Sequence, residues 1–185
     1  MSLQYTQVDS QSDVDLILEL QRINHVSGVD PVTMVTQGFV TVRHEPEVLR
    51  QMNESFPSVI AKDGPLLAGY CLVMPIKFGH RIPELISMFG LLESLPWKGG
   101  RLGDSDKWFV MGQVCVAEAY RGQGVFDGMY HKMREVCSPV FDFTVTEIAE
   151  RNQRSMRAHE RVGFRTIHTY VDEKETWNVV AWDWS

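Results

Sequence analysis

Apolar residues recur along the chain with two different periods, and each period predicts a type of element. Helical spacing predicts a first helix capped by Ser12 and a second helix that begins at Pro46, a residue favoured in the first turn. Short apolar runs over residues 58–61 and 66–74, with a polar turn between them, predict a β-hairpin. Residues 5–8 are the expected first strand.

The second half of the chain repeats the alternation of strands and helices. A nearly continuous apolar run over residues 107–116 predicts a central strand covered on both faces. The pattern then predicts a helix, a strand, a helix and two strands, which begin at residues 122, 140, 152, 164 and 176. This order predicts one domain over residues 1–185, of mixed α/β (α+β) class, with a central sheet flanked by helices.

Residues 76–106 interrupt this order. They carry two apolar clusters and then several glycines, which predicts one helix followed by a long exposed loop. Long loops in compact domains are often functional, so this insert is a candidate lid or acceptor-binding segment.

Composition narrows the class of protein. The chain has 185 residues, 44% of them hydrophobic and 23% charged, which is typical of a globular domain. Its formal net charge of −6 disfavours nucleic acid as a partner. No apolar run reaches the roughly 18 residues of a membrane span, and no signal peptide is visible, so we expect a cytoplasmic protein without membrane contact. Cys71, Cys115 and Cys137 lie in apolar stretches without a metal-ligand spacing, which predicts reduced core thiols and no metal.

The strongest chemical signal follows the central strand. The sequence Arg121-Gly122-Gln123-Gly124 stands between that strand and the predicted helix. Glycines allow a ligand to approach the backbone closely, and the first N–H groups of a helix attract anions. The segment therefore predicts a pyrophosphate site with Arg121 as an adjacent positive charge, or else a plain strand-to-helix turn.

A second segment extends this signal into a family resemblance. Arg121-Gly122-Gln123-Gly124 resembles motif A of the GNAT superfamily of acetyltransferases, the turn that binds the pyrophosphate of coenzyme A. Asn152 and the residues through Phe164, with Arg154, Glu160 and Gly163 at matching positions, resemble motif B. The two motifs, together with their strands, span residues 107–164, and the order of the flanking elements also matches the family.

The resemblance implies a fold in which two central strands splay apart and the pantetheine arm of acetyl-CoA enters between them. Main-chain groups of the strand segment Val114, Cys115 and Val116 would bind that arm, and Asn152 would lie beside it. The pyrophosphate would be held by Arg121 and by N–H groups of Gly122, Gln123, Gly124, Val125 and Phe126. Phe126 departs from the motif, where Gly or Ala is usual, and we expect its side chain to pack under the helix.

The resemblance also implies acetyl transfer to an amine, with Glu147 as the base and His159 as the acid. Glu147 lies five residues before Asn152, and His159 lies seven residues after it, where the family usually has Tyr. A strand-end carboxylate that caps the next helix and an inward-packed histidine are the structural alternatives. Glu84 in the insert is the next candidate base.

Two other functions remain open at this stage. One is a coenzyme A-binding sensor or interaction module without chemistry, which Phe126 and the missing Tyr would suit. The other is an acyltransferase that uses a longer acyl-CoA or acylates a hydroxyl. Trp177, Trp182 and Trp184 alternate with other residues in the last strand, where core packing is expected and a homodimer contact is left open.

Overall fold

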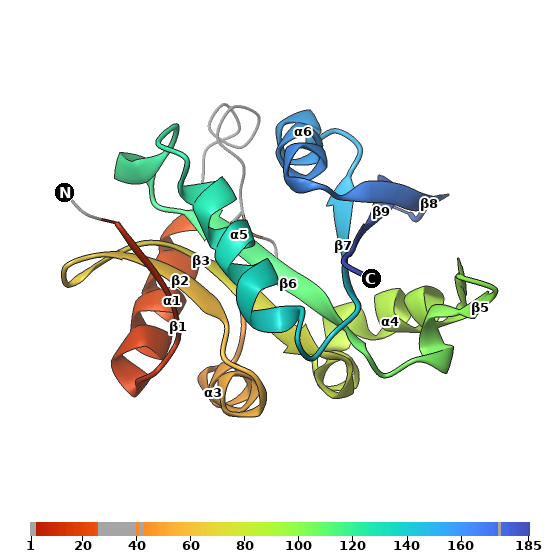
Figure 1. Ribbon diagram of the computed structural model, residues 1–185, viewed down its shortest axis with the longest axis horizontal. Helices are drawn as coiled ribbons and strands as arrows, with labels where there is room; N and C mark the ends of the chain where they lie inside the picture. Colours follow the sequence, from red (N-terminus) through yellow and green to blue (C-terminus); the bar gives the residue numbers. More distant parts are fainter. Residues whose placement is uncertain (1–2, 26–39, 41–42, 174) are drawn as a thin grey trace.

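The computed structural model describes residues 3–25, 40, 43–173 and 175–185, and it contains one seven-stranded sheet in the order β1-β2-β3-β6-β7-β9-β8 (Figure 1). Neighbouring strands run antiparallel, except for the parallel central pair β6 and β7. The strands are β1 (Gln4–Gln7), β2 (Val59–Asp63), β3 (Leu66–Pro75), β6 (Trp108–Val116), β7 (Phe143–Ala149), β8 (Arg165–Val171) and β9 (Thr176–Asp183).

Helices cover both faces of the sheet and enclose two cores. Helices α5 (Val125–Cys137) and α6 (Gln153–Val162) lie on one face, which we call the α5 face. Helices α1 (Gln11–Asn24), α3 (Pro46–Ser55) and α4 (Ile86–Ser94) contribute to the core on the other face, which we call the α1 face. The predicted mixed α/β class is thereby confirmed.

The first helix begins earlier than its sequence predicts. Ser10, not Ser12, is the N-cap of α1, and its hydroxyl accepts a hydrogen bond from the Asp13 N–H at 3.3 Å. Asp13 is buried and pairs with Lys62 of β2 at 2.8 Å. The ion pair of Asp13 with Lys62 ties the first turn of the helix to the sheet, a tertiary contact that helical spacing does not reveal.

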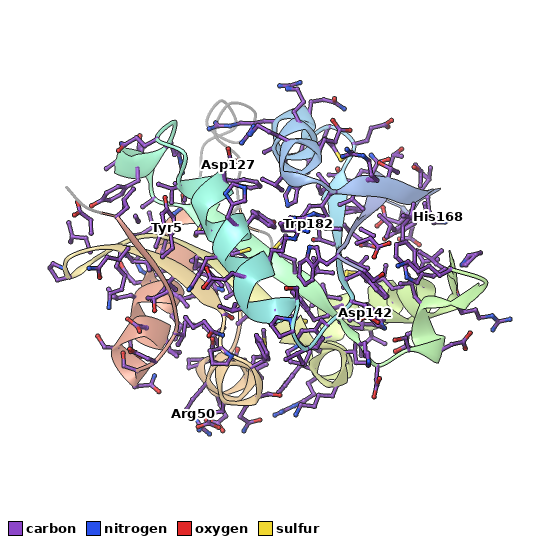
Figure 2. All side chains as sticks on the ribbon, in the orientation of Figure 1. Tyr5, Arg50, Asp127, Asp142, His168 and Trp182 are labelled. Atoms are coloured by element: carbon purple, nitrogen blue, oxygen red, sulfur yellow. The ribbon has the colours of Figure 1, made fainter. Side chains whose placement is uncertain are left out.

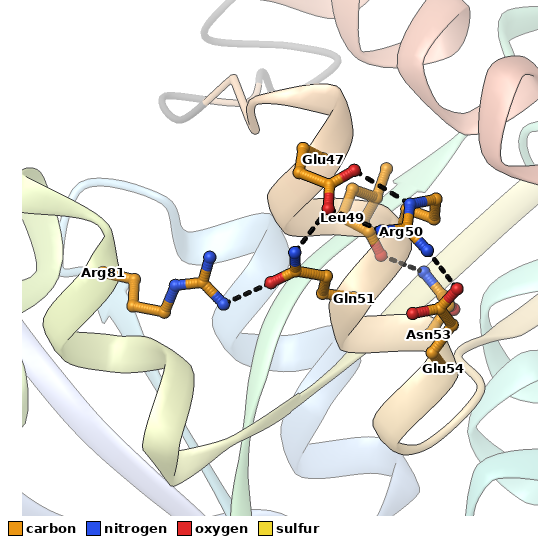
Figure 3. Close-up of polar contacts among 7 residues, drawn as sticks. All are labelled: Glu47, Leu49, Arg50, Gln51, Asn53, Glu54 and Arg81. Atoms are coloured by element: carbon orange, nitrogen blue, oxygen red, sulfur yellow. Dashed lines mark hydrogen bonds and ion pairs between the residues drawn. The ribbon is translucent and has the colours of Figure 1, made fainter.

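Helix α3 begins at Pro46 as predicted, and its exposed face carries a chain of polar contacts (Figure 3). Arg50 Nε donates to Glu47 at 2.9 Å, and Arg81 beyond β3 donates to Gln51. Exposed ion pairs contribute at most about 1 kcal/mol, so burial of the fully covered Leu49 does more to hold the helix in place.

The insert over residues 76–106 is more regular than a loop. Beside α4 it contains three 3₁₀ turns and a short hairpin of β4 (Pro96–Trp97) and β5 (Gly100–Arg101). The Trp97 ring packs 4.8 Å from the Phe143 ring of β7, and Leu102 is fully buried. Two-residue strands are too short to show a period, which is why the sequence predicts only a loop. A lid role for the insert stays a hypothesis.

The central strands separate soon after they meet. β6 and β7 pair only over three residues each, the last pair being Val110 with Val145. Beside this point β6 carries one extra residue, because Val73 of β3 pairs with Met111 and Cys71 pairs with Val114. The chain therefore has the splay that the resemblance implies.

Within the part of the chain that the structure describes, no helix is long and apolar enough to span a membrane. Cys71, Cys115 and Cys137 are buried and free, as predicted. Trp182 packs in the core on the α5 face, in agreement with the predicted packing role.

Candidate active site

The end of β6 presents main-chain groups to the gap beside β7. The Ala117 N–H donates to the Ala68 carbonyl next to β3 at 2.9 Å. Because hydrogen-bonding directions alternate along a strand, the main-chain groups of Cys115 also face β3, while the N–H and C=O groups of Val114 and the N–H group of Val116 point into the gap. This is the orientation that an extended ligand lying between the strands requires.

A left-handed turn joins β6 to α5. Gly122 and Gly124 have φ values of +75° and +77°, which strongly favour glycine. The first bond of α5 runs from the Gly128 N–H to the Gly124 carbonyl at 3.0 Å, so the N–H groups before it belong to the donor-rich helix terminus. A Cβ added at Gly122 or Gly124 would meet nothing within 4 Å. The turn is therefore open to a ligand that approaches the backbone.

These groups line a cavity of about 550 Å³ between the first turns of α5 and α6. Nine of the ten predicted cofactor residues line it: Val114, Cys115, Val116, Arg121, Gly122, Gly124, Val125, Phe126 and Asn152. Gln123 is exposed, and its side-chain amide donates to the Ala119 carbonyl at 2.7 Å. The two motifs, far apart in sequence, thus meet at one site.

Arginines dominate the charge of the cavity lining. Arg154, Arg157 and Arg161 contribute from α6. Arg161 Nη2 lies 2.6 Å from Asp127 Oδ1, so this ion pair links α6 to the first turn of α5, where Figure 2 labels Asp127. The positive lining suits an anionic ligand with several phosphates.

Arg121 has a structural role that the sequence does not show. Its Nε donates to the Val116 carbonyl at 3.2 Å, and its Nη2 donates to Asn24 Oδ1 of α1 at 2.8 Å. The guanidinium therefore holds the end of β6 and the turn against α1. Asn24 also lines the cavity, and its helical position gives no signal of this in the sequence.

Two motif residues combine packing with a place at the cavity. Asn152 is the N-cap of α6, since its side chain accepts a hydrogen bond from the Ser155 N–H at 3.1 Å. The Phe126 ring packs 4.6 Å from Tyr130 and 5.2 Å from His159, measured between ring centres. The packing expected for Phe126 is what the structure shows.

His159 does not have the environment that a catalytic acid needs. The side chain is only 2% exposed, and it does not line the cavity. Its Nε2 lies 2.7 Å from Tyr130 Oη, and its Nδ1 lies 2.8 Å from the Ser155 carbonyl. Burial lowers the pKa of His159 to about 4, so the ring is neutral at pH 7 and has no imidazolium proton to give. The inward-packed alternative describes this histidine.

Glu147 has the environment of a base. Its carboxylate projects from β7 on the α1 face, and Tyr170 Oη lies 3.0 Å from both of its oxygens. Burial raises the pKa of Glu147 to about 7; the Tyr170 hydrogen bond opposes this rise, and the charge of Asp172 adds to it. Sequence reasoning missed Tyr170, which is 23 residues away on β8. The side chain of Glu84 lies outside the part of the chain that the structure describes.

Comparisons with known proteins give matches in structure alone: no protein-family profile and no curated protein matches the sequence. The structure of yncA from Salmonella typhimurium, solved with its cofactor acetyl-CoA, is 12% identical with a TM-score of 0.64, over 100% of this chain and 95% of that one. The ribosomal-protein-S18-alanine N-acetyltransferase from Escherichia coli is 9% identical with a TM-score of 0.64, over the same shares. An acetyltransferase of the GNAT family from Streptococcus pneumoniae is 12% identical with a TM-score of 0.62, over 100% of both chains.

The splayed parallel pair, the glycine turn and the cavity beside them define a class of mixed α/β folds whose central sheet opens between two parallel strands. The full-length superpositions identify that class: the chain has the GNAT fold, as its two motifs predict. The resemblance is thus confirmed at the level of the fold.

Proposed function

We propose that this chain is a member of the GNAT superfamily and, as one domain over residues 1–185, transfers an acetyl group from acetyl-CoA to a primary amine. The observation that carries the proposal is the cavity, where nine of the ten residues predicted to bind coenzyme A come together. The acceptor is an amine of a small molecule or a peptide. Buried free thiols support a cytoplasmic location.

The cavity suits coenzyme A in its chemistry as well as its place. N–H groups at the start of α5 would bind the pyrophosphate, and open space at Gly122 and Gly124 allows close approach. Main-chain groups of Val114 and Val116 would bind the pantetheine arm. Acetyl-CoA would then reach through the gap from the α5 face toward the α1 face, where Glu147 lies.

Glu147 would take the proton from the acceptor ammonium, directly or through a water. A base whose pKa is about 7 is half ionised at neutral pH and still basic enough to accept a proton. The free amine then attacks the thioester carbonyl in a ternary complex, and the carbon–sulfur bond breaks. As the amide forms, the attacking nitrogen loses its second proton to water, and the thiolate takes a proton from water, since His159 is buried and neutral.

The test is the rate of thiol release from acetyl-CoA with a panel of primary amines. Glu147→Gln keeps the size of the side chain and removes its basicity, so we expect the rate to fall roughly 10²–10⁴-fold with acetyl-CoA binding unchanged. Glu150→Gln is the matched control, because Glu150 is exposed and directly follows the last residue of the same strand. A full rate in Glu147→Gln would show that the base lies elsewhere.

The same assay separates the rival functions. A coenzyme A sensor would bind acetyl-CoA and release no thiol with any amine, in the wild type or the variant. An acyltransferase for longer chains would prefer butyryl-CoA or hexanoyl-CoA to acetyl-CoA, and an O-acyltransferase would respond to alcohols.

A further inference from the structure

Tyr170 reaches Glu147 across an intervening strand. β9 lies between β7 and β8, and Glu147 pairs with Val179 of β9, whereas Tyr170 pairs with Trp177. The phenol therefore extends diagonally over β9 on the α1 face. Its hydroxyl lies 3.0 Å from both Oε1 and Oε2 of Glu147, which centres it on the carboxylate.

The direction of the hydrogen bond follows from the chemistry of the two groups. Burial raises the pKa of Tyr170, as does the nearby charge of Glu147, so the phenol stays protonated. The protonated hydroxyl therefore donates the hydrogen bond to the carboxylate. The His168 ring lies nearly parallel to the Tyr170 ring, with ring centres 6.3 Å apart and planes 17° apart. A hydroxyl centred on both carboxylate oxygens limits rotation of the carboxylate.

We propose that Tyr170 is a positioning residue that holds the Glu147 carboxylate toward the acceptor through its hydroxyl. This inference rests on the proposed role of Glu147 as the base. An unrestrained glutamate on a strand samples several rotamers, and proton transfer needs one of them. Because the hydroxyl stabilises the ionised carboxylate, it also limits how far burial raises the pKa of Glu147, whereas the charge of Asp172 raises that pKa further. The neighbouring His168 contacts the ring of Tyr170.

The test compares Tyr170→Phe with Thr169→Val. Tyr170→Phe removes one hydroxyl and keeps the ring. Thr169→Val removes a hydroxyl from the preceding residue of β8; this hydroxyl donates at 2.9 Å to Asn178 of β9. The readouts are the rate against pH and the ¹³C NMR titration of the Glu147 carboxyl, assigned with Glu147→Gln. Thermal melting shows that each variant is folded.

We expect Tyr170→Phe to move the acidic limb of the rate profile and the Glu147 titration upward by about one pH unit, the usual effect of a hydrogen bond to a charged group. The kcat value should fall about tenfold, with the KM for acetyl-CoA unchanged, and Thr169→Val should change neither. The proposal is overturned if Tyr170→Phe leaves both the profile and the titration unmoved, or if Thr169→Val shifts them equally.

Failure of the proposed function gives a different pattern. In that case Glu147→Gln keeps the full rate, yet the NMR titration still reports whether Tyr170 holds the carboxylate. If Glu147→Gln is inactive and Tyr170→Phe behaves as the wild type, only the inference about Tyr170 fails.

Discussion

His159 and Tyr130 form a buried polar pair between α6 and α5. Tyr130 Oη and His159 Nε2 form a hydrogen bond of 2.7 Å, and His159 Nδ1 also forms a hydrogen bond with the Ser155 carbonyl. An unsatisfied buried hydroxyl costs roughly 1–3 kcal/mol. We therefore expect His159→Phe to lower the free energy of unfolding by that amount, measured by urea denaturation, and to leave kcat almost unchanged.

His131→Phe serves as the control for this substitution, because His131 lies on α5 directly after Tyr130 and is exposed. Its effect should stay within about 0.5 kcal/mol. A large loss of kcat in a stably folded His159→Phe protein would return His159 to a catalytic role.

The sequence predicts the position of Glu147 but not the burial of His159 or the contact made by Tyr170. The position of Glu147 follows from its distance to Asn152, because both belong to one continuous motif. The burial of His159 does not follow, since it depends on Phe126 and Tyr130 of another helix. Tyr170 is also out of reach, because its contact with Glu147 depends on the register of β8 and β9.

The turn from β6 into α5 is the element that the proposed donor site depends on most. Gly124→Ala places a methyl group in the open space before the helix, where the pyrophosphate would bind. Because a ligand stabilises only the folded chain that binds it, we expect acetyl-CoA to raise the melting temperature of the wild type and not of this variant.

Gly64→Ala is a matched control for backbone strain. Gly64 has a φ of +58°, and a Cβ there also meets nothing within 4 Å, but it lies in the turn between β2 and β3, away from the cavity. Both variants should lose about 1 kcal/mol of stability, while Gly64→Ala keeps the shift with acetyl-CoA. Equal ligand shifts in the two variants would contradict a pyrophosphate site at this turn.

Helices and strands long enough to show a hydrophobic period were predictable from sequence, whereas two-residue strands were not. The hairpin of β2 and β3, the central strand and helices α5 and α6 all lie close to their expected positions. The hairpin of β4 and β5 has two residues in each strand, and it is held by the contact of Trp97 with Phe143. That contact joins residues 46 positions apart, which no local pattern encodes.

The stability of the whole molecule should depend on pH through two buried histidines and the half-buried Glu147. Burial lowers the pKa values of His44 and His159 to about 4. As pH falls below 6.5, these histidines therefore bind protons in the unfolded chain and stay neutral in the native chain. Each histidine therefore costs about 2 kcal/mol of stability between pH 7 and pH 5. The pKa of Glu147 is raised to about 7, so its carboxyl binds a proton in the native chain first and adds about 2 kcal/mol of stability between pH 7 and pH 5.

We expect the wild type to lose about 2 kcal/mol of unfolding free energy between pH 7 and pH 5, and Glu147→Gln to lose about 4 kcal/mol. Urea denaturation at the two pH values measures both. Identical losses in the two proteins would mean that the carboxyl of Glu147 titrates normally in the native chain.

The short ladder between β6 and β7 also divides the sheet by position along the chain. Every strand on one side of the gap comes from residues 4–116, and every strand on the other side comes from residues 143–183. Neither half-sheet needs a strand from the other half to complete its own pairing. During synthesis the first half leaves the ribosome before the second exists, so the order of translation matches the order in which the two halves can fold.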